Sequence, residues 1–95
     1  MYYYANYGSY GGKQGIITNN EIMVSNSSAA YGIYCYYPYQ SWNIYNNSIR
    51  VESSGSVAYG AYLYNTSTSY IISLRNNLLM AKSSTAYPVY VSSAT

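Results

Sequence analysis

The chain has 95 residues and a net charge of +2, with four basic and two acidic side chains. This length allows one small domain, and so little charge does not supply the basic stripe that nucleic-acid binding requires. No run approaches the roughly 18 apolar residues of a membrane-spanning helix, and the absence of His and Asp leaves no plausible set of metal ligands. We therefore expect no nucleic-acid partner, no membrane insertion and no metal or other cofactor.

Two short motifs recur in step with each other. An Asn-Asn pair followed by alternating apolar residues begins at Asn19, Asn46 and Asn76. A Tyr-x-x-Tyr motif begins at Tyr7, Tyr31, Tyr59 and Tyr87, and the last three are 28 residues apart. A fixed period of this length predicts stacked repeats.

The period predicts one β-solenoid unit over residues 1–95, with coils at about 7–30, 31–58 and 59–86 and a partial coil at 87–95. We expect three short strands in each coil, joined by turns. In the first coil the inward candidates are Ile17, Ile22 and Val24. Gly15 takes the repeat position that Trp42 holds in the second coil.

The second coil gives the clearest pattern of alternation. Its predicted strands are 31–37, 41–45 and 48–52, and Pro38 ends the first of them. The inward candidates are Ile33, Cys35, Trp42, Ile44, Ile49 and Val51. The single cysteine cannot form an internal disulfide, and its position on the face of Ile33 indicates a small buried hydrophobe.

The third coil repeats the scheme, and its inward candidates are Ala61, Leu63, Ile72, Leu74, Leu79 and Ala81. Val89 and Val91 begin the partial fourth coil. No stretch has the 3.6-residue apolar period of a helix. The fold class predicted is therefore all-β, a right-handed parallel β-helix of about three coils plus one extra strand, with coils about 4.8 Å apart.

The pattern Asn-Asn-x-Ile-x-Val, followed by a polar turn and Tyr-Gly-Ile-Tyr, resembles the repeats of the pectate-lyase-like superfamily of right-handed parallel β-helices. It is most similar to the short, repeat-rich bacterial surface and secreted members. The resemblance implies an asparagine ladder before the third strand, formed here by Asn20, Asn47 and Asn77. Asn also tolerates a left-handed backbone at a tight bend, and a stacked amide can both donate and accept.

The resemblance implies a comparison with the enzymes of this superfamily, which act on polysaccharides with clusters of carboxylates. This chain has only two carboxylates, Glu21 and Glu52. Their repeat positions differ, so they should not face each other across a substrate bond. Glu52 should instead stack on Lys82 of the next coil as a cross-strand ion pair. We expect no catalytic residues and no enzymatic activity.

Tyrosines occupy three shared repeat positions. One position holds Tyr31, Tyr59 and Tyr87, the second holds Tyr34, Tyr62 and Tyr90, and the third holds Tyr36 and Tyr64. The outward contact surface is predicted to consist of the second and third sets, Tyr34, Tyr62, Tyr90, Tyr36 and Tyr64. Tyrosine suits strand surfaces and can simply hold the coils in register. A flat array of aromatic rings is equally a contact surface for another copy, a glycan or a solid surface.

The predicted final strand presents an open edge, which favours association with another chain. The residues predicted to associate are Tyr87, Val89, Tyr90 and Val91. The function expected is a self-associating structural or adhesive solenoid, a homo-oligomer or fibre located outside the cell or on its surface. The alternatives are a carbohydrate-binding module, or a non-catalytic fragment of a longer polysaccharide-processing β-helix protein.

Overall fold

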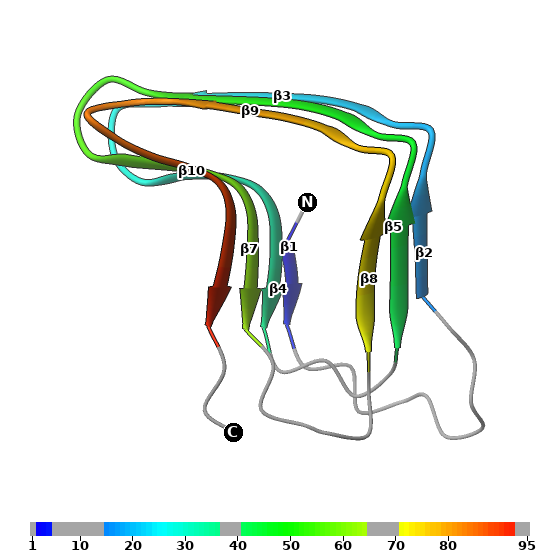
Figure 1. The fold of residues 1–95 in the computed structure, drawn as a ribbon. Helices are drawn as coiled ribbons and strands as arrows, with labels where there is room; N and C mark the ends of the chain where they lie inside the picture. The colour runs from blue at the N-terminus through cyan, green and yellow to red at the C-terminus, as the bar shows by residue number, and fades with distance from the viewer. Residues whose placement is uncertain (1, 5–14, 37–40, 65–70, 93–95) are drawn as a thin grey trace.

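The computed structural model describes residues 2–4, 15–36, 41–64 and 71–92 (Figure 1). Every regular element in these four segments is a β-strand, so this part of the chain offers no helix that could cross a membrane. The strands are β1 (Tyr2–Tyr4), β2 (Gly15–Thr18), β3 (Glu21–Asn26), β4 (Ala30–Tyr36), β5 (Trp42–Tyr45), β6 (Ser48–Ser53), β7 (Val57–Tyr64), β8 (Ile72–Arg75), β9 (Leu78–Lys82) and β10 (Thr85–Ser92).

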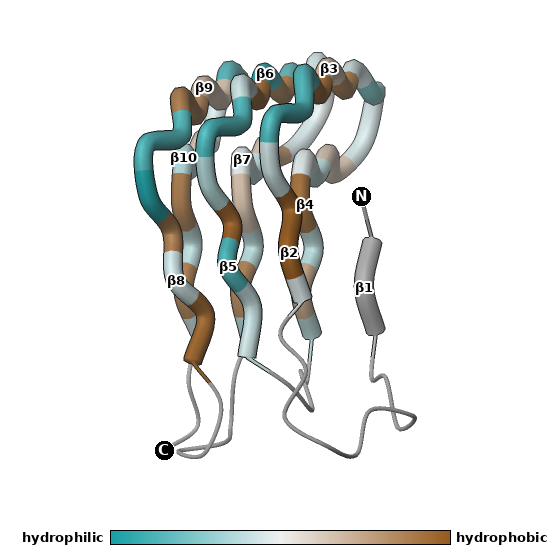
Figure 2. The backbone as a smooth tube through the Cα atoms, turned by 90° about the vertical axis from the view of Figure 1, so that its right-hand side faces the viewer, coloured by the Kyte–Doolittle hydropathy of each residue, from teal (hydrophilic) through white to brown (hydrophobic). Residues whose placement is uncertain are grey.

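The strands form three parallel sheets. Sheet A has the order β1-β4-β7-β10, sheet B the order β2-β5-β8 and sheet C the order β3-β6-β9. The chain visits the sheets in the order A, B, C and advances by one strand at each turn, winding as a right-handed helix (Figures 1 and 2). The predicted parallel β-helix is thereby confirmed, with three coils and an additional strand in sheet A.

Apolar side chains stack in inward columns, as the alternation predicted. Ile17, Ile44 and Leu74 share one column, and Ile22, Ile49 and Leu79 share another. The middle coil is the most deeply buried, with Ile33, Ile44, Ile49 and Val51 at most 1% exposed. It is covered on both sides in all three sheets, whereas in sheets B and C the strands of the outer coils each have a single neighbour.

Gly15 and Trp42 are partners in register, as predicted. The indole ring of Trp42 lies over Gly15, so closely that a Cβ at Gly15 would collide with the ring. The absence of a side chain in the first coil is therefore what makes room for the largest side chain of the second coil.

Sheet A bends at a corner that alternation did not predict. Gly32 and Ile33 are both buried although they are adjacent in β4, and Gly60 and Ala61 repeat this in β7. The strands β4, β7 and β10 curve along their length (Figure 1). A Cβ at Gly32 would lie 2.5 Å from the carbonyl oxygen of Gly60, so the coils can approach here only because the residue is glycine.

The two asparagines of each pair have different tasks. The first ones, Asn19, Asn46 and Asn76, have φ of 58°, 57° and 53°, which asparagine tolerates better than most residues. The second ones form the hydrogen-bonded ladder described below. The sequence pattern predicts both properties at the second asparagine, whereas the positive φ belongs to the first.

The start of the chain contributes a strand that the period did not predict. β1 pairs with β4 through Tyr2↔Tyr34, Tyr3↔Cys35 and Tyr4↔Tyr36. The motif that begins at Tyr7, from which the first coil was predicted to start, lies outside the described residues. Sheet A therefore has a strand ahead of the predicted first coil.

Candidate contact surfaces: the C-terminal end and the tyrosine face

A ladder of amides connects the three coils at the bend between sheets B and C. Asn20 Nδ2 donates to Asn47 Oδ1 at 3.1 Å, and Asn47 Nδ2 donates to Asn77 Oδ1 at 3.0 Å. The backbone N–H groups of Asn20 and Asn47 donate to the same two oxygens. Each oxygen thus accepts two hydrogen bonds from the preceding coil, which fixes the orientation of every amide.

The ladder is directional, so its two ends differ. At the N-terminal end, the side-chain oxygen of Asn20 accepts no hydrogen bond from the described residues. At the C-terminal end, Asn77 Nδ2 donates to the carbonyl of Ile44, and its backbone N–H has no acceptor within the described part. One end therefore presents an acceptor and the other presents donors.

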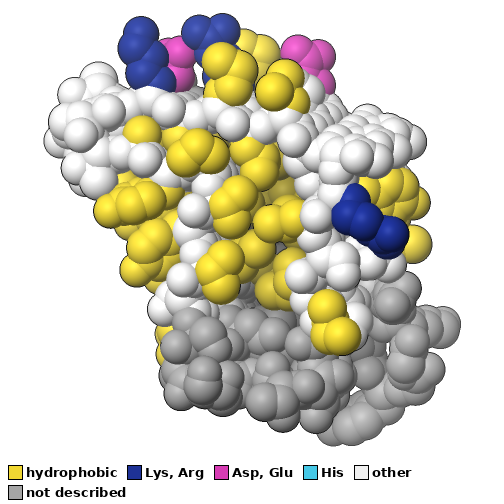
Figure 3. All heavy atoms as spheres, in the orientation of Figure 1, with side chains coloured by type: hydrophobic (Ala, Val, Ile, Leu, Met, Phe, Trp, Pro, Cys, Tyr) yellow, Lys and Arg dark blue, Asp and Glu magenta, His cyan; other side chains and the backbone are white. Residues whose placement is uncertain are grey.

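The C-terminal end exposes side chains that belong to inward columns. In one column Cys35 and Leu63 are 3% and 4% exposed, whereas Val91 is 66% exposed. In the next column Ala61 is fully buried and Val89 is 40% exposed. Figure 3, which looks onto this end, shows hydrophobic side chains spread across it. These valines are exposed because no described strand pairs with the outer edge of β10.

The same end leaves the inward residues of sheets B and C partly uncovered. Ile72, Leu74, Leu79 and Ala81 are half-buried, in contrast to Ile44 and Ile49. Together with Val89 and Val91 they form the surface that we call the C-terminal end. An apolar surface of this kind, framed by open backbone edges, is typical of a contact site.

The tyrosine face lies on the outer side of sheet A. Rings stack along the columns at centroid distances of 4.7–5.5 Å. The columns are Tyr31–Tyr59–Tyr87, Tyr34–Tyr62–Tyr90 and Tyr36–Tyr64. Between the first two columns the rings meet edge to face, with interplanar angles of 88° within β4 and within β7 and 68° within β10. Both arrangements are favourable for aromatic rings, so the face is an ordered array.

Crowding within the array changes the acidity of its central members. Desolvation first, and then repulsion from neighbouring tyrosines, raises the pKa of both Tyr59 and Tyr62. The raised pKa means that the fold favours the neutral phenol. Its contribution to stability is fully present below the unfolded pKa of about 10 and is lost as pH rises through the higher folded pKa.

We expect the Tyr59→Phe/Tyr62→Phe double variant to lose less stability than the wild type between about pH 9 and pH 11. The variant removes two groups that charge unfavourably in the folded state. The measurement is the urea midpoint across this pH range. Cys35 titrates in the same range and is common to both proteins, so its effect cancels. Parallel declines of the two midpoints would show that the array does not disfavour ionisation.

Cys35 lies in the core beneath this face. Burial raises the pKa of its thiol to about 11, so the nucleophilic thiolate is scarce near neutral pH. In the sheet, Cys35 lies between Leu63 of β7 and the strand β1. Cys35 therefore acts as a small hydrophobic side chain of the core.

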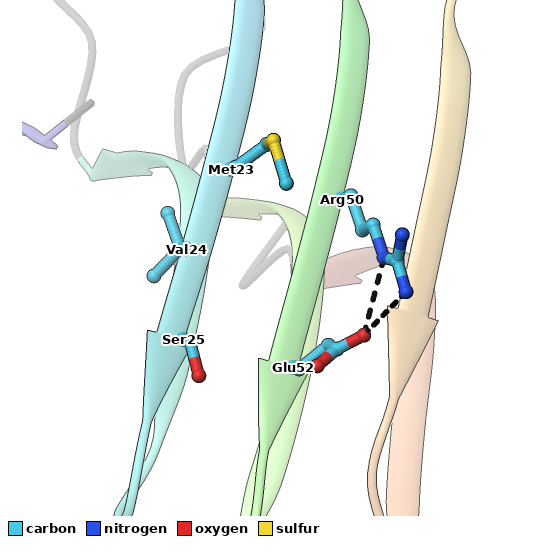
Figure 4. A pocket seen from close by; sticks show the side chains of 5 residues that line it. All are labelled: Met23, Val24, Ser25, Arg50 and Glu52. Carbon is cyan, nitrogen blue, oxygen red and sulfur yellow. Dashed lines mark hydrogen bonds and ion pairs between the residues drawn. The ribbon is translucent and has the colours of Figure 1, made fainter.

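Sheet C carries Glu21, Arg50, Glu52 and Lys82, and a shallow pocket lies at its N-terminal edge (Figure 4). The pocket has a volume of about 280 Å³ and is lined by Met23, Val24, Ser25, Arg50 and Glu52. Both Nε and Nη2 of Arg50 donate to Glu52 Oε1, at 3.1 and 2.9 Å. Both side chains are more than a third exposed, so the pair contributes little to stability.

This ion pair corrects the expected one. Glu52 and Lys82 do lie opposite each other in register, but the carboxylate turns along its own strand to Arg50. The fork of the arginine offers two donors to one oxygen, which a lysine ammonium does not. Glu21 lies in a different column from Glu52. In the described part no three His, Cys, Asp or Glu side chains come together as a metal site would require.

Three features of these surfaces were not identified from the sequence: β1, the Arg50–Glu52 pair and the corner at Gly32. A signal for the corner was present, since Gly32, Gly60 and Pro88 occupy one position of the tyrosine motif. Comparison with family models, curated proteins and solved structures gives no match to this chain.

Proposed function

We propose that the chain is a structural β-solenoid that self-associates through its C-terminal end, in assembly or adhesion on a cell surface or outside the cell. The observation that carries the proposal is the exposure of Val91 in a column whose other described members, Cys35 and Leu63, are buried. Covering this end with a second copy would remove apolar surface from water, which favours association.

The tyrosine face supports a second, lateral contact in the same function. Its rings are already ordered by their neighbours, so little conformational entropy is lost when a partner binds. Tyrosine is also enriched at protein interfaces. Tyr34, Tyr62 and Tyr90, with Tyr36 and Tyr64 beside them, are the contact residues proposed.

We further propose kinship with the pectate-lyase-like β-helices, in a non-catalytic form. The ladder of Asn20, Asn47 and Asn77 lies where that resemblance implies it. The lack of activity is proposed because the two carboxylates lie in different columns and one of them, Glu52, is occupied by Arg50. Most glycoside hydrolases use two carboxyl groups that flank the bond they cleave.

A carbohydrate-binding module is the alternative from a different functional class. The stacked rings of the tyrosine face are favourable to it, because a flat aromatic surface can pack against a sugar ring. Sedimentation with insoluble polysaccharide distinguishes the two. Binding that is lost in the Tyr34→Ala/Tyr62→Ala variant would favour the module. The fragment alternative also stays open, since the next coil of a longer solenoid would cover the same end.

We expect the Val91→Lys variant to associate at least several-fold more weakly than the wild type. The charge would lie in the surface that the second copy must desolvate, without a partner to neutralise it. The measurement is particle mass by light scattering over a range of matched concentrations. Tyr90→Pro, which removes a backbone donor from the same edge strand, should act in the same direction.

The matched control is Ser48→Lys, because Ser48 is exposed in β6, the central strand of sheet C, and so lies away from both ends of the solenoid. This variant should associate as the wild type does. A strictly monomeric wild type would overturn the assembly proposal. Equal association of the wild type and Val91→Lys would move the contact from the C-terminal end to the tyrosine face.

A further inference from the structure

A second copy can continue the solenoid in only one orientation. Sheets B and C end at β8 and β9, so β2 and β3 of the second copy would pair with them, and its β4 would pair with β10. This register places Asn20 of the second copy next to Asn77 of the first. The free donors of Asn77 then meet the free oxygen of Asn20, as Asn47 already meets Asn77.

The apolar columns agree with the same register. Ile17 of the second copy would follow Leu74, and Ile22 would follow Leu79. Ile22 and Leu79 are both half-buried in the single chain. In the stack each would have an apolar neighbour on both sides, as Ile49 already has. Sheets B and C are thus complementary at the two ends of the molecule.

Sheet A is not complementary, because β1 already occupies the edge of β4. Its pairing with Tyr34, Cys35 and Tyr36 uses the backbone groups that β10 of another copy would need. β1 spans three residues, whereas β10 pairs with β7 from Thr85 to Ser92. Continuous stacking therefore requires β1 to leave β4.

Pro88 is a second obstacle in sheet A. In the two preceding coils the same position is glycine, because a Cβ at Gly32 or Gly60 would collide with the carbonyl oxygen of the next coil. Pro88 carries a Cβ and a ring at this position. The carbonyl of Gly32 in a second copy would therefore meet the proline ring, and Pro88 also has no backbone N–H to donate.

We propose that β1 and Pro88 restrain end-to-end growth, so that sheet A of this chain is guarded at both ends against a second copy. The inference rests on the proposed function, since it concerns the same contact. Protection of exposed sheet edges by short strands and prolines is a general device of β-proteins. Head-to-tail growth becomes continuous when both guards are removed, with Asn77 of one copy bonded to Asn20 of the next.

The test compares the wild type with a double variant that begins at Ala5, and so lacks β1, and carries Pro88→Gly. The glycine restores the residue found in the other two coils. We expect the mean particle mass of the double variant to exceed that of the wild type at least several-fold, with filaments in electron micrographs. Adding Val91→Lys to the double variant should abolish the gain, because it charges the same end. Circular dichroism at high dilution verifies that each variant is folded.

The outcomes separate the two proposals. Growth of the double variant beyond an associating wild type supports both. Growth of the double variant from a monomeric wild type supports the guards and overturns the proposed function of the natural chain. An associating wild type with no further growth of the folded double variant overturns the guards alone. If the wild type and the double variant are both monomeric, both proposals are overturned. If the gain in mass persists when Val91→Lys is added, growth does not use the C-terminal end, and the proposal that β1 and Pro88 guard that contact is overturned.

Discussion

Replacing Ile49 with Ala should lower the free energy of unfolding by about 2–5 kcal/mol. Ile49 is 1% exposed, and Ile22 and Leu79 flank it in its column. Coils on both sides hold the surrounding side chains in place, so the cavity left by the substitution cannot collapse. Since a domain has a total stability of only about 5–15 kcal/mol, the variant should show a large decrease in its urea midpoint.

The control for this prediction is the same chemical change at Ile16, which is 58% exposed on the outer side of sheet B. Ile16→Ala should change the free energy of unfolding by about 0.5 kcal/mol or less. Similar losses for the two variants would contradict the assignment of inward and outward columns, and with it the register of sheet C.

Replacing Asn47 with Ala should lower the free energy of unfolding by about 2–5 kcal/mol. Asn47 is 2% exposed. Its side chain donates to the carbonyl of Ile17 and to Asn77, and accepts from both nitrogens of Asn20. The substitution leaves these buried groups without partners, and that loss costs more than a hydrogen bond contributes. Chemical denaturation of the wild type and the variant measures the difference.

Two further variants make this test specific to the ladder. Asn47→Asp keeps the size but replaces the donor with an oxygen that faces the carbonyl of Ile17, so it should be as damaging as alanine. Asn26→Ala removes an exposed amide that donates to Ser28 and Ala29 and accepts from the backbone N–H of Ser27. Because these bonds are exposed to solvent, the substitution should cost less than about 1 kcal/mol. Equal stability of Asn47→Ala and Asn26→Ala would exclude the ladder as a source of stability.

The columns could be predicted from the sequence because the repeat and the strand period together leave little freedom. The repeat decides which residues stack, as with Ile44 and Leu74, and alternation decides which of them point inward. The tyrosine columns followed for the same reason. The two recurring motifs thus specified both the fold and the composition of its outer face.

Three features could not be predicted from the repeat period: the strand β1, the corner at Gly32 and the ion-pair partner of Glu52. Tyr2 of β1 pairs with Tyr34 of β4, which lies 32 positions further along the chain. The tyrosine motif repeats every 28 residues, so the period did not predict a strand at Tyr2. The corner at Gly32 depends on how closely two backbones approach. The partner of Glu52 depends on side-chain rotamers, because the register brings both Arg50 and Lys82 near it.

The uniform parallel pairing also has a consequence for how the chain folds. No described strand pairs with the next strand along the chain, and the ladder connects residues 27 and 30 positions apart. The first native pair therefore forms only after a loop of roughly 30 residues has closed, which costs entropy before any contact repays it. Once two coils are in place, each further strand adds to an existing edge. We therefore expect folding of this chain to be limited by one nucleation event, the closure of the first coil pair, followed by faster winding of the remaining turn.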